Sequence, residues 1–117
     1  MGNRIGVLIA STRRQGNCER LVERAVLPAL EAEGVEARPM RLADYSVSPC
    51  VACESCHKTG ECVKRDGFSS FERDLVGLDA LIVVAPIYFG GPSAQFKALL
   101  DRFQAAWARR YVLHEND

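Results

Sequence analysis

The stretch NRIGVLIAS, residues 3–11, decides the fold. It is an almost continuous apolar run bounded by polar residues, which is typical of a strand buried on both faces, as in a parallel sheet. A second run, ALIVVAPI at residues 80–87, has the same character, and we predict a second fully buried strand there. Neither run is long enough to span a bilayer. We expect these two strands to form the centre of the domain.

Helical periodicity follows the first strand and precedes the second. Residues 18–33 carry an apolar stripe at helical spacing, and Pro28 inside this pattern should kink the helix or split off its last turn. Residues 69–79 begin with Ser69 and Glu72 at the spacing of a capping box, which predicts a short helix.

The remaining segments complete an alternating order. Residues 93–110 show a third helical face, with Ser93 as its cap. Residues 35–43 predict a weaker strand, which Pro39 places near an edge of the sheet. Between residues 44 and 68 there is no convincing period, and a loop of that length in a compact domain is usually functional. Strands alternating with helices predict a parallel sheet with crossover helices.

Composition limits the classes of function. The chain has 117 residues, near the commonest size of one domain, and its 15 basic residues balance 15 acidic ones. No net field therefore favours nucleic acid or an anionic membrane surface, and we expect neither as a partner. The N-terminus has no signal-peptide layout. We expect a cytoplasmic protein, in which thiols stay reduced.

Ligands of open parallel sheets bind beyond the carboxyl ends of the strands, where the strand order reverses. The loop STRRQGN, residues 11–17, follows the first strand and leads into a helix N-terminus, whose free amides favour an anion. Ser11 and Asn17 add hydrogen-bond donors, and Gly16 allows close approach of the backbone. A terminal phosphate would satisfy these groups, although a polar turn with a helix cap explains the composition equally well.

The loop after the other apolar strand is PIYFGG, residues 86–91. Tyr88 and Phe89 can flank a planar ring, while the two glycines present bare backbone amides. A hydrophobic strand end followed by a tight turn is the alternative interpretation. Taken together, the two loops suggest a phosphorylated planar cofactor.

These loops resemble those of the NADPH-dependent FMN reductase family. STRRQGNCERLVE is similar to that family's flavin phosphate loop, and APIYFGGPSAQFKALLDR is similar to its second flavin loop and the helix that follows. The resemblance covers nearly the whole chain and implies a flavodoxin-like three-layer α/β sandwich with strand order 2-1-3 and FMN at the switch point. It also implies an oxidoreductase. The family positions shared by the second loop and its helix are Pro86, Tyr88, Lys97, Asp101 and Arg102.

The resemblance assigns roles by position. The residues expected to hold the FMN phosphate are Ser11, Arg13, Gly16, Asn17 and Cys18. The residues expected along the isoalloxazine ring are Pro86, Ile87, Tyr88, Phe89 and Gly90. Two positions depart from the family pattern, because Thr12 replaces a proline and Cys18 replaces a threonine, whose hydroxyl is the stronger donor. Flavin N5 does the chemistry, so no side chain is assigned a catalytic role.

Four of the five cysteines lie in CVACESCHKTGEC, residues 50–62, with the spacing C-x2-C-x2-C-x5-C. In the cytoplasm such clusters more often bind metal than form disulfides. The pattern resembles the start of bacterial ferredoxin motifs and the iron–sulfur flavoprotein branch of the reductase family. That resemblance implies one 4Fe–4S cluster, while zinc on the same thiolates or with His57, free thiols and disulfides remain alternatives. The four expected cluster ligands are Cys50, Cys53, Cys56 and Cys62.

We expect residues 1–117 to form one partial flavodoxin-like domain, with residues 44–68 as a cysteine-rich insertion loop. The usual fourth and fifth strands are missing, which would leave the strand at 80–87 as an apolar edge. A fragment, a short natural variant or a sheet completed by another copy would explain this, and we favour a homo-oligomer.

The leading functional expectation is an FMN-binding redox protein. It would transfer electrons from a reduced donor, either NAD(P)H or an electron carrier, to a small acceptor, through a 4Fe–4S cluster. The alternative is a non-catalytic flavodoxin-like binding or assembly module with a structural metal or free thiols.

Overall fold

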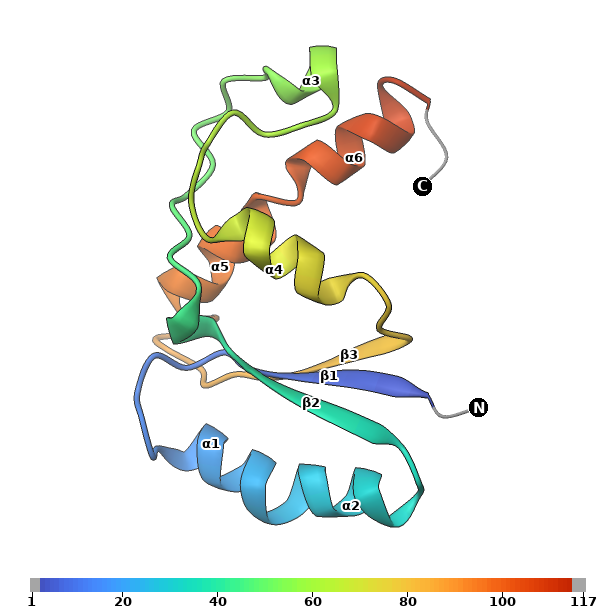
Figure 1. The fold of residues 1–117 in the computed structure, drawn as a ribbon. Helices are drawn as coiled ribbons and strands as arrows, with labels where there is room; N and C mark the ends of the chain where they lie inside the picture. Colours follow the sequence, from blue (N-terminus) through green and yellow to red (C-terminus); the bar gives the residue numbers. More distant parts are fainter. Residues whose placement is uncertain (1–2, 115–117) are drawn as a thin grey trace.

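The computed structural model describes residues 3–114 and contains a three-stranded parallel sheet between two helical layers (Figure 1). The sheet has the order β2-β1-β3. The predicted fold class, an α/β sandwich with parallel strand order 2-1-3, is therefore confirmed. The strands are β1 (Arg4–Ile9), β2 (Glu36–Arg41) and β3 (Ala80–Val84).

The central strand β1 is buried on both faces, as its apolar run predicts. Successive side chains of a strand point to opposite faces of the sheet. Leu8 accordingly packs in one core cluster with Phe71, while Val7 and Ile9 pack in a second cluster with Val22. These two clusters join the sheet to both helical layers.

Strand β3 corrects one prediction. The composition of residues 80–87 predicted a fully buried strand, but regular pairing ends at Val84 and the strand is not fully buried. The apolar edge that we expected there without the usual fourth and fifth strands is confirmed, since β3 is an edge strand of the described sheet. Leu81 is 37% exposed and Val83 is 39% exposed. The physical reason is that β3 pairs with β1 on one side only, so its side chains lack neighbours on the other side. By contrast, the predicted edge position of the second strand is confirmed, since β2 contains Pro39 and lies at the opposite edge.

The helical layer below the sheet in Figure 1 is one nearly continuous segment that changes its winding. Pro28 stands near the start of its last part and lacks the N–H that an α-helix needs. The predicted interruption is present, but it lies before Pro28 as a π-helical stretch, whose wider turn accommodates the proline ring. The three parts are α1 (Asn17–Leu21), η1 (Val22–Val26) and α2 (Leu27–Ala32).

The layer above the sheet begins with α4 (Phe68–Leu75). The predicted capping box at Ser69 and Glu72 is wrong, because the helix starts one residue earlier and neither side chain caps it. Instead, the Asp66 Oδ1 atom accepts a hydrogen bond from the Phe68 N–H at 3.1 Å.

The same layer also contains α5 (Ala94–Asp101) and α6 (Gln104–Tyr111), where we predicted one helix over residues 93–110. The cap at Ser93 is confirmed, since its Oγ accepts from the Phe96 N–H at 3.2 Å. The helix divides at Arg102 and Phe103, and the Arg102 N–H turns back to the Leu99 carbonyl at 3.2 Å. None of the helices described within residues 3–114 is long and apolar enough to cross a membrane.

The cysteine-rich segment leaves β2 through the 3-10 turn η2 (Leu42–Asp44) and contains a short helix, α3 (Cys56–Thr59). Cys56 is buried against Ala105 and Ala108 of α6. Helices α3 and α6 therefore lie together above the rest of the upper layer (Figure 1).

Candidate functional site

The loops that follow β1 and β3 leave the sheet side by side. Ile9 and Val84 are register partners, and the Ala10 N–H donates to the Val84 carbonyl at 2.9 Å. Because the two strands are parallel neighbours, residues 11–17 and 86–91 emerge at the same edge of the sheet (Figure 1). The structure thus brings together the two segments that the sequence singled out as flavin loops.

The first of these loops forms a tight polar turn. The Arg13 N–H donates to Ser11 Oγ at 3.2 Å, and Gln15 has a left-handed backbone with φ of 56°. Gly16 is buried and precedes α1, and no side chain of the described structure caps this helix start. The first amides of α1, beginning with exposed Asn17, are therefore free to receive an anionic group.

Cys18 lies at this loop but turns its side chain into the lower core. It is half-buried and packs against the cluster that contains Val7 and Val22. The thiol thus contributes to packing, and cysteine suits this position because it behaves as a small hydrophobic residue. Its backbone amide remains in the first turn of α1.

The next residue, Glu19, is buried although it is charged, and sequence reasoning missed it. Its carboxylate accepts a hydrogen bond from Arg41 of β2, and this hydrogen bond lowers the pKa of Glu19 below its usual range. The ion pair fixes the start of α1, which follows residues 11–16, to the edge strand β2.

The second loop closes in a turn of two residues. Tyr88 and Gly91 exchange backbone hydrogen bonds of 2.7 and 3.0 Å. Phe89 and Gly90 between them have φ of 40° and 86°, the left-handed pair that a type I′ turn requires. Phe89 is fully exposed, although a left-handed backbone is costly for an aromatic residue. Strain combined with exposed aromatic surface is typical of a binding loop.

The neighbours of this turn present further apolar surface at the same edge. Ile87 is 82% exposed and Tyr88 is 47% exposed, while Pro86 is half-buried at the end of the strand. A Cβ atom added to Gly90 or Gly91 would meet nothing within 4 Å, so the backbone of the turn is open. This surface fits a planar aromatic ligand such as a flavin ring.

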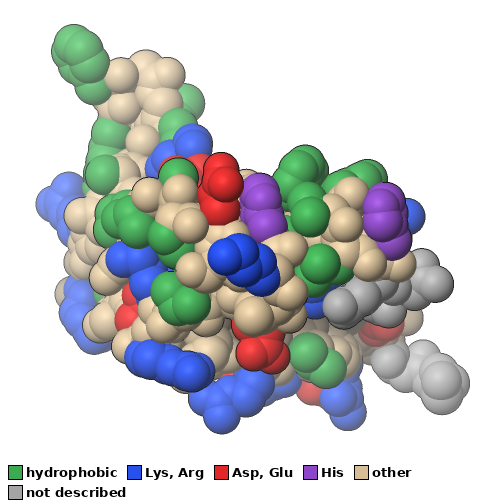
Figure 2. All heavy atoms as spheres, turned by 90° about the horizontal axis from the view of Figure 1, so that it is seen from above, with side chains coloured by type: hydrophobic (Ala, Val, Ile, Leu, Met, Phe, Trp, Pro, Cys, Tyr) green, Lys and Arg blue, Asp and Glu red, His purple; other side chains and the backbone are tan. Residues whose placement is uncertain are grey.

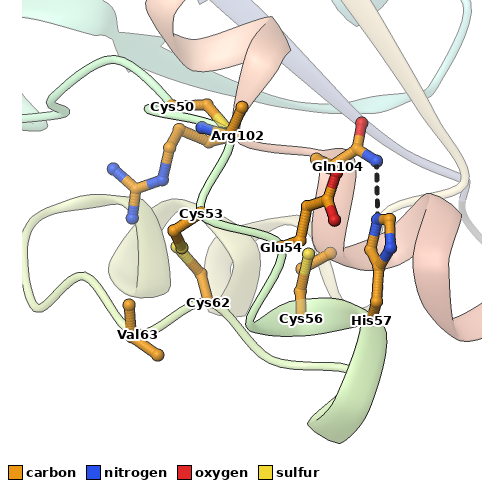
Figure 3. A pocket seen from close by; sticks show the side chains of 11 residues that line it. Cys50, Cys53, Glu54, Cys56, His57, Cys62, Val63, Arg102 and Gln104 are labelled. Carbon is orange, nitrogen blue, oxygen red and sulfur yellow. Dashed lines mark hydrogen bonds between the residues drawn. The ribbon is translucent and has the colours of Figure 1, made fainter.

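The four clustered cysteines line one cavity of about 210 Å³ (Figure 3). Two residues between them, Ala52 and Glu54, have left-handed backbones with φ of 57° and 64°. Each such residue carries a strain that persists only where surrounding structure imposes it. The residues that share the cavity wall with the cysteines include His57, Arg102 and Gln104.

The thiols of this cavity are free and differ in environment. Cys53 is exposed, and its hydrogen bonds with the backbone and the hydroxyl of Ser55 lower its pKa. Cys56 is buried, and its pKa is raised first by burial and then by the charges of the other three cysteines. The disulfide alternative is therefore absent from this structure, whereas the thiol alternative is compatible with it.

Within residues 3–114, no three His, Cys, Asp or Glu side chains are close enough together to hold a metal ion. The cysteines thus share a cavity without forming a closed ligand set, and ligation requires their side chains to draw together. Four thiols from one segment around one cavity match the donor set of an iron–sulfur cluster or a structural zinc ion. His57 is turned toward α6, with its Nε2 atom 3.4 Å from Gln104 Nε2.

Sequence reasoning noted Arg102 only as a family position and missed its place at this cavity. Arg102 is 2% exposed, and its guanidinium lies 5.1 Å from the ring centre of Phe68. Nη1 donates to Asp66 Oδ2 at 2.7 Å and to the Ser48 carbonyl at 2.9 Å. The sequence does contain one sign of this role, because Arg102 stands among apolar residues at the end of a helix. An arginine in such a place is expected to be buried, and a buried guanidinium needs hydrogen-bond partners.

Asp66 completes this arrangement, because its Oδ2 atom also accepts the Ser48 N–H at 2.9 Å. The hydrogen bond from Arg102 holds the pKa of Asp66 well below its usual range, although burial opposes the shift. Ser48 and Asp66 flank the cysteines in sequence, so both ends of the cysteine segment are fastened at the end of α5.

A second contact holds the middle of the cysteine segment, near α3. The Arg109 Nη1 atom of α6 donates to the Gly60 carbonyl at 2.8 Å, just past α3. Figure 2 shows the molecule from above, with hydrophobic side chains between the two histidines. Trp107 and Tyr111 of α6 are 48% and 59% exposed.

Comparison with known structures shows which class of fold this chain has. The crystal structure of RosB with the bound intermediate 8-demethyl-8-formylriboflavin-5′-phosphate superposes with a TM-score of 0.69 and 19% sequence identity. The match covers 88% of this chain and 42% of RosB. It confirms a flavodoxin-like α/β fold.

The family model described as NADPH-dependent FMN reductase matches residues 3–114, and the chain belongs to this family. An iron–sulfur flavoprotein of Methanocaldococcus jannaschii is 39% identical over 92 residues, which cover 79% of this chain and 47% of that protein. An iron–sulfur flavoprotein of Methanosarcina thermophila is 35% identical over 92 residues, which cover 79% of this chain and 48% of the relative. The chain thus spans about half the length of the curated relatives that it matches.

Proposed function

We propose that this chain binds FMN and works in a redox protein that transfers electrons from a reduced donor to a small acceptor. The observation that carries the proposal is the pairing of Ile9 with Val84, because it puts both flavin-type loops at one sheet edge. Membership of the FMN reductase family and similarity to proteins named iron–sulfur flavoproteins support it. The donor is NAD(P)H or an electron carrier, and the reaction takes place in the cytoplasm.

The proposed phosphate site uses the loop between β1 and α1. Ser11 supplies a hydroxyl, Arg13 a charge, and Gly16 a backbone without a side chain. The amides of Asn17 and Cys18 supply the donors of the helix start.

The proposed ring site uses the loop after β3, where the apolar and aromatic groups cover the isoalloxazine. The structure supports this with the exposure of Ile87, Tyr88 and Phe89 and with the open backbone at Gly90. Pro86 ends the strand and starts this surface. A bound flavin supplies the capacity to accept a hydride and to pass electrons on singly.

We further propose that Cys50, Cys53, Cys56 and Cys62 hold one 4Fe–4S cluster. Their spacing, their shared cavity and the names of the relatives support this. Zinc on the same thiolates is the alternative metal, since it accepts the same tetrahedral sulfur ligands.

We also propose that a second copy of the chain covers the edge strand β3. Leu81 and Val83 expose apolar side chains there, and an exposed sheet edge is a template for pairing. A homo-oligomer would remove this edge from water and would enclose the neighbouring flavin loops.

A second candidate function is a non-catalytic module with free thiols or a structural metal. The observation that favours its free-thiol form is that the described thiols do not form a closed ligand set. It predicts a colourless protein without affinity for flavin.

The visible spectrum of the full chain, purified without oxygen, separates the two candidates. Flavin bands in the blue and near-ultraviolet with a broad brown shoulder are expected for FMN and the cluster together. Added FMN should bind to any flavin-free fraction of the protein, and the fluorescence of FMN should fall when it binds. A colourless protein that takes up no FMN would exclude the proposed redox function.

A further inference from the structure

The cysteine cavity contains one side chain whose charge is opposite to that of a thiolate centre. Of the residues described along its wall, Arg102 is the only lysine or arginine. Figure 3 shows its side chain in the cavity wall together with the labelled cysteines. Glu54 also lines the cavity, so the wall carries one carboxylate besides the thiols.

The ion pair with Asp66 uses only some of the hydrogen-bond donors of the Arg102 guanidinium. Nη1 makes both described hydrogen bonds, to Asp66 and to the Ser48 carbonyl. The Nε atom is buried and has no hydrogen-bond partner in the described structure. Buried N–H groups almost always have a partner, and one that has none calls for a missing acceptor.

A thiolate-ligated cluster at the four cysteines would supply that acceptor. Sulfur atoms of such clusters accept hydrogen bonds, and these bonds and the nearby net charge set the reduction potential. Arg102 offers both an N–H donor and a permanent positive charge at the wall where the thiols gather.

We propose that Arg102 donates its Nε–H to a sulfur atom of the cluster or of a ligating cysteine, and that it thereby raises the cluster's reduction potential. The inference rests on the proposed function, because it presupposes a 4Fe–4S cluster on these cysteines. It assigns Arg102 two distinct tasks, in which Nη1 fastens the cysteine segment and Nε serves the metal centre.

Two substitutions separate these tasks. R102K keeps a positive charge for Asp66 but removes the Nε–H. D66N removes the ion pair but leaves the arginine in the cavity wall. Should R102K not fold, the double variant R102M/D66N removes donor and ion pair together without leaving one charge unpaired. R109K is the matched control, because Arg109 also holds the cysteine segment but does not line the cavity.

Each full-length variant is reconstituted without oxygen with ferrous iron and sulfide, and its iron and acid-labile sulfide are measured. A redox titration followed by electron paramagnetic resonance then gives the reduction potential of the cluster. We expect R102K to lower the equilibrium constant for reduction about tenfold, a shift of about 59 mV for one electron. D66N and R109K should shift the potential less. Should R102K hold no cluster, the potential of R102M/D66N is compared with that of D66N, and the same lowering is expected.

Three outcomes would overturn the inference. A cluster in R102K with the wild-type potential, or equal changes in R102K and D66N, would show that Arg102 acts only through its ion pair. Either result leaves the proposed function intact. A wild-type protein that takes up no iron would instead remove the proposed cluster and this inference together.

Discussion

Arg102 and Asp66 form an ion pair that closes the cysteine segment, with 2.7 Å between Nη1 and Oδ2. Their side chains are 1% and 16% exposed. Arg102 directly follows α5, and Asp66 supplies the hydrogen-bond acceptor at the start of α4. Arg102 also binds the Ser48 carbonyl, so both ends of the cysteine segment are held against the upper helical layer.

The pair makes stability depend on pH in the acid range. The pKa of Asp66 is lowered in the folded state, while the ordinary pKa of an aspartate is about 3.9. Its contribution is therefore fully present above about pH 4 and is lost as the pH falls toward the lower folded value. We expect D66N to reduce the free energy of unfolding by about 3 kcal/mol at pH 7. Urea denaturation at pH 7 and pH 3 should show a smaller difference between wild type and D66N at pH 3. An equal difference at both pH values would contradict this assignment.

Gly67 is needed because two backbones approach closely. A Cβ atom at this position would lie 2.5 Å from the Ser46 nitrogen, which cannot move aside like the end of a side chain. We expect G67A to destabilise the protein by about 1–3 kcal/mol, measured by chemical denaturation. G91A is the matched control, since its Cβ would meet nothing within 4 Å and should change stability by less than about 0.5 kcal/mol.

We expect Phe89 to lower the stability of the fold while it contributes to FMN binding. Its left-handed backbone suits asparagine far better than phenylalanine, so F89N should raise the free energy of unfolding by about 1 kcal/mol. The same substitution removes a ring from the proposed flavin surface and should weaken FMN binding. Thermal denaturation and fluorescence titration with FMN measure the two effects. Unchanged FMN affinity in F89N would remove Phe89 from the ring site.

Cys56 is the buried member of the cysteine cluster and the sharpest test of the ligand set. Serine lacks the soft sulfur that iron–sulfur clusters require. We therefore expect C56S to lose iron and the brown absorption but to keep FMN. C18S is the control, because Cys18 packs in the lower core and should leave the iron content unchanged. Iron content in C56S equal to that of wild type would show that the ligand set is wrong.

Val83 lies on the exposed edge strand and tests the proposed oligomer. A lysine on a sheet edge opposes pairing with another strand. We expect V83K to shift the protein toward the monomer in sedimentation analysis. L21K is the control, because it adds the same charge on α1, away from the edge strand. Leu21 is 50% exposed, and its replacement should leave the oligomeric state unchanged. A wild-type protein that is monomeric at all concentrations would contradict the proposed oligomer.

Local patterns were sufficient to predict much of this fold. The apolar run of β1, the edge position of β2 with its Pro39, and the cap at Ser93 depend on residues close together in the chain. The alternation of strands and helices predicted a parallel sheet. The strand order 2-1-3 was implied by the resemblance to the FMN reductase family, and the structure confirms it. These predictions held because periodicity and turn chemistry act over short separations.

The candidate flavin loops were also recognisable, because each is a short motif at the end of an apolar strand. Their proximity depends on the parallel pairing of β1 with β3, which the family resemblance implied and which the register Ile9 to Val84 shows. Burial of β3 could not be read from its composition, since it depends on whether a further strand or another chain covers its free edge.

The sequence by itself determined a parallel sheet of order 2-1-3, two flavin-type loops and four cysteines in one segment. Only the tertiary structure decided that Arg102 closes this segment on Asp66 and lines the cysteine cavity, while its buried Nε has no hydrogen-bond partner among residues 3–114. The physical reason is distance along the chain. Two charged residues 36 positions apart carry no local pattern that announces their pairing, and burial alone makes that pairing necessary.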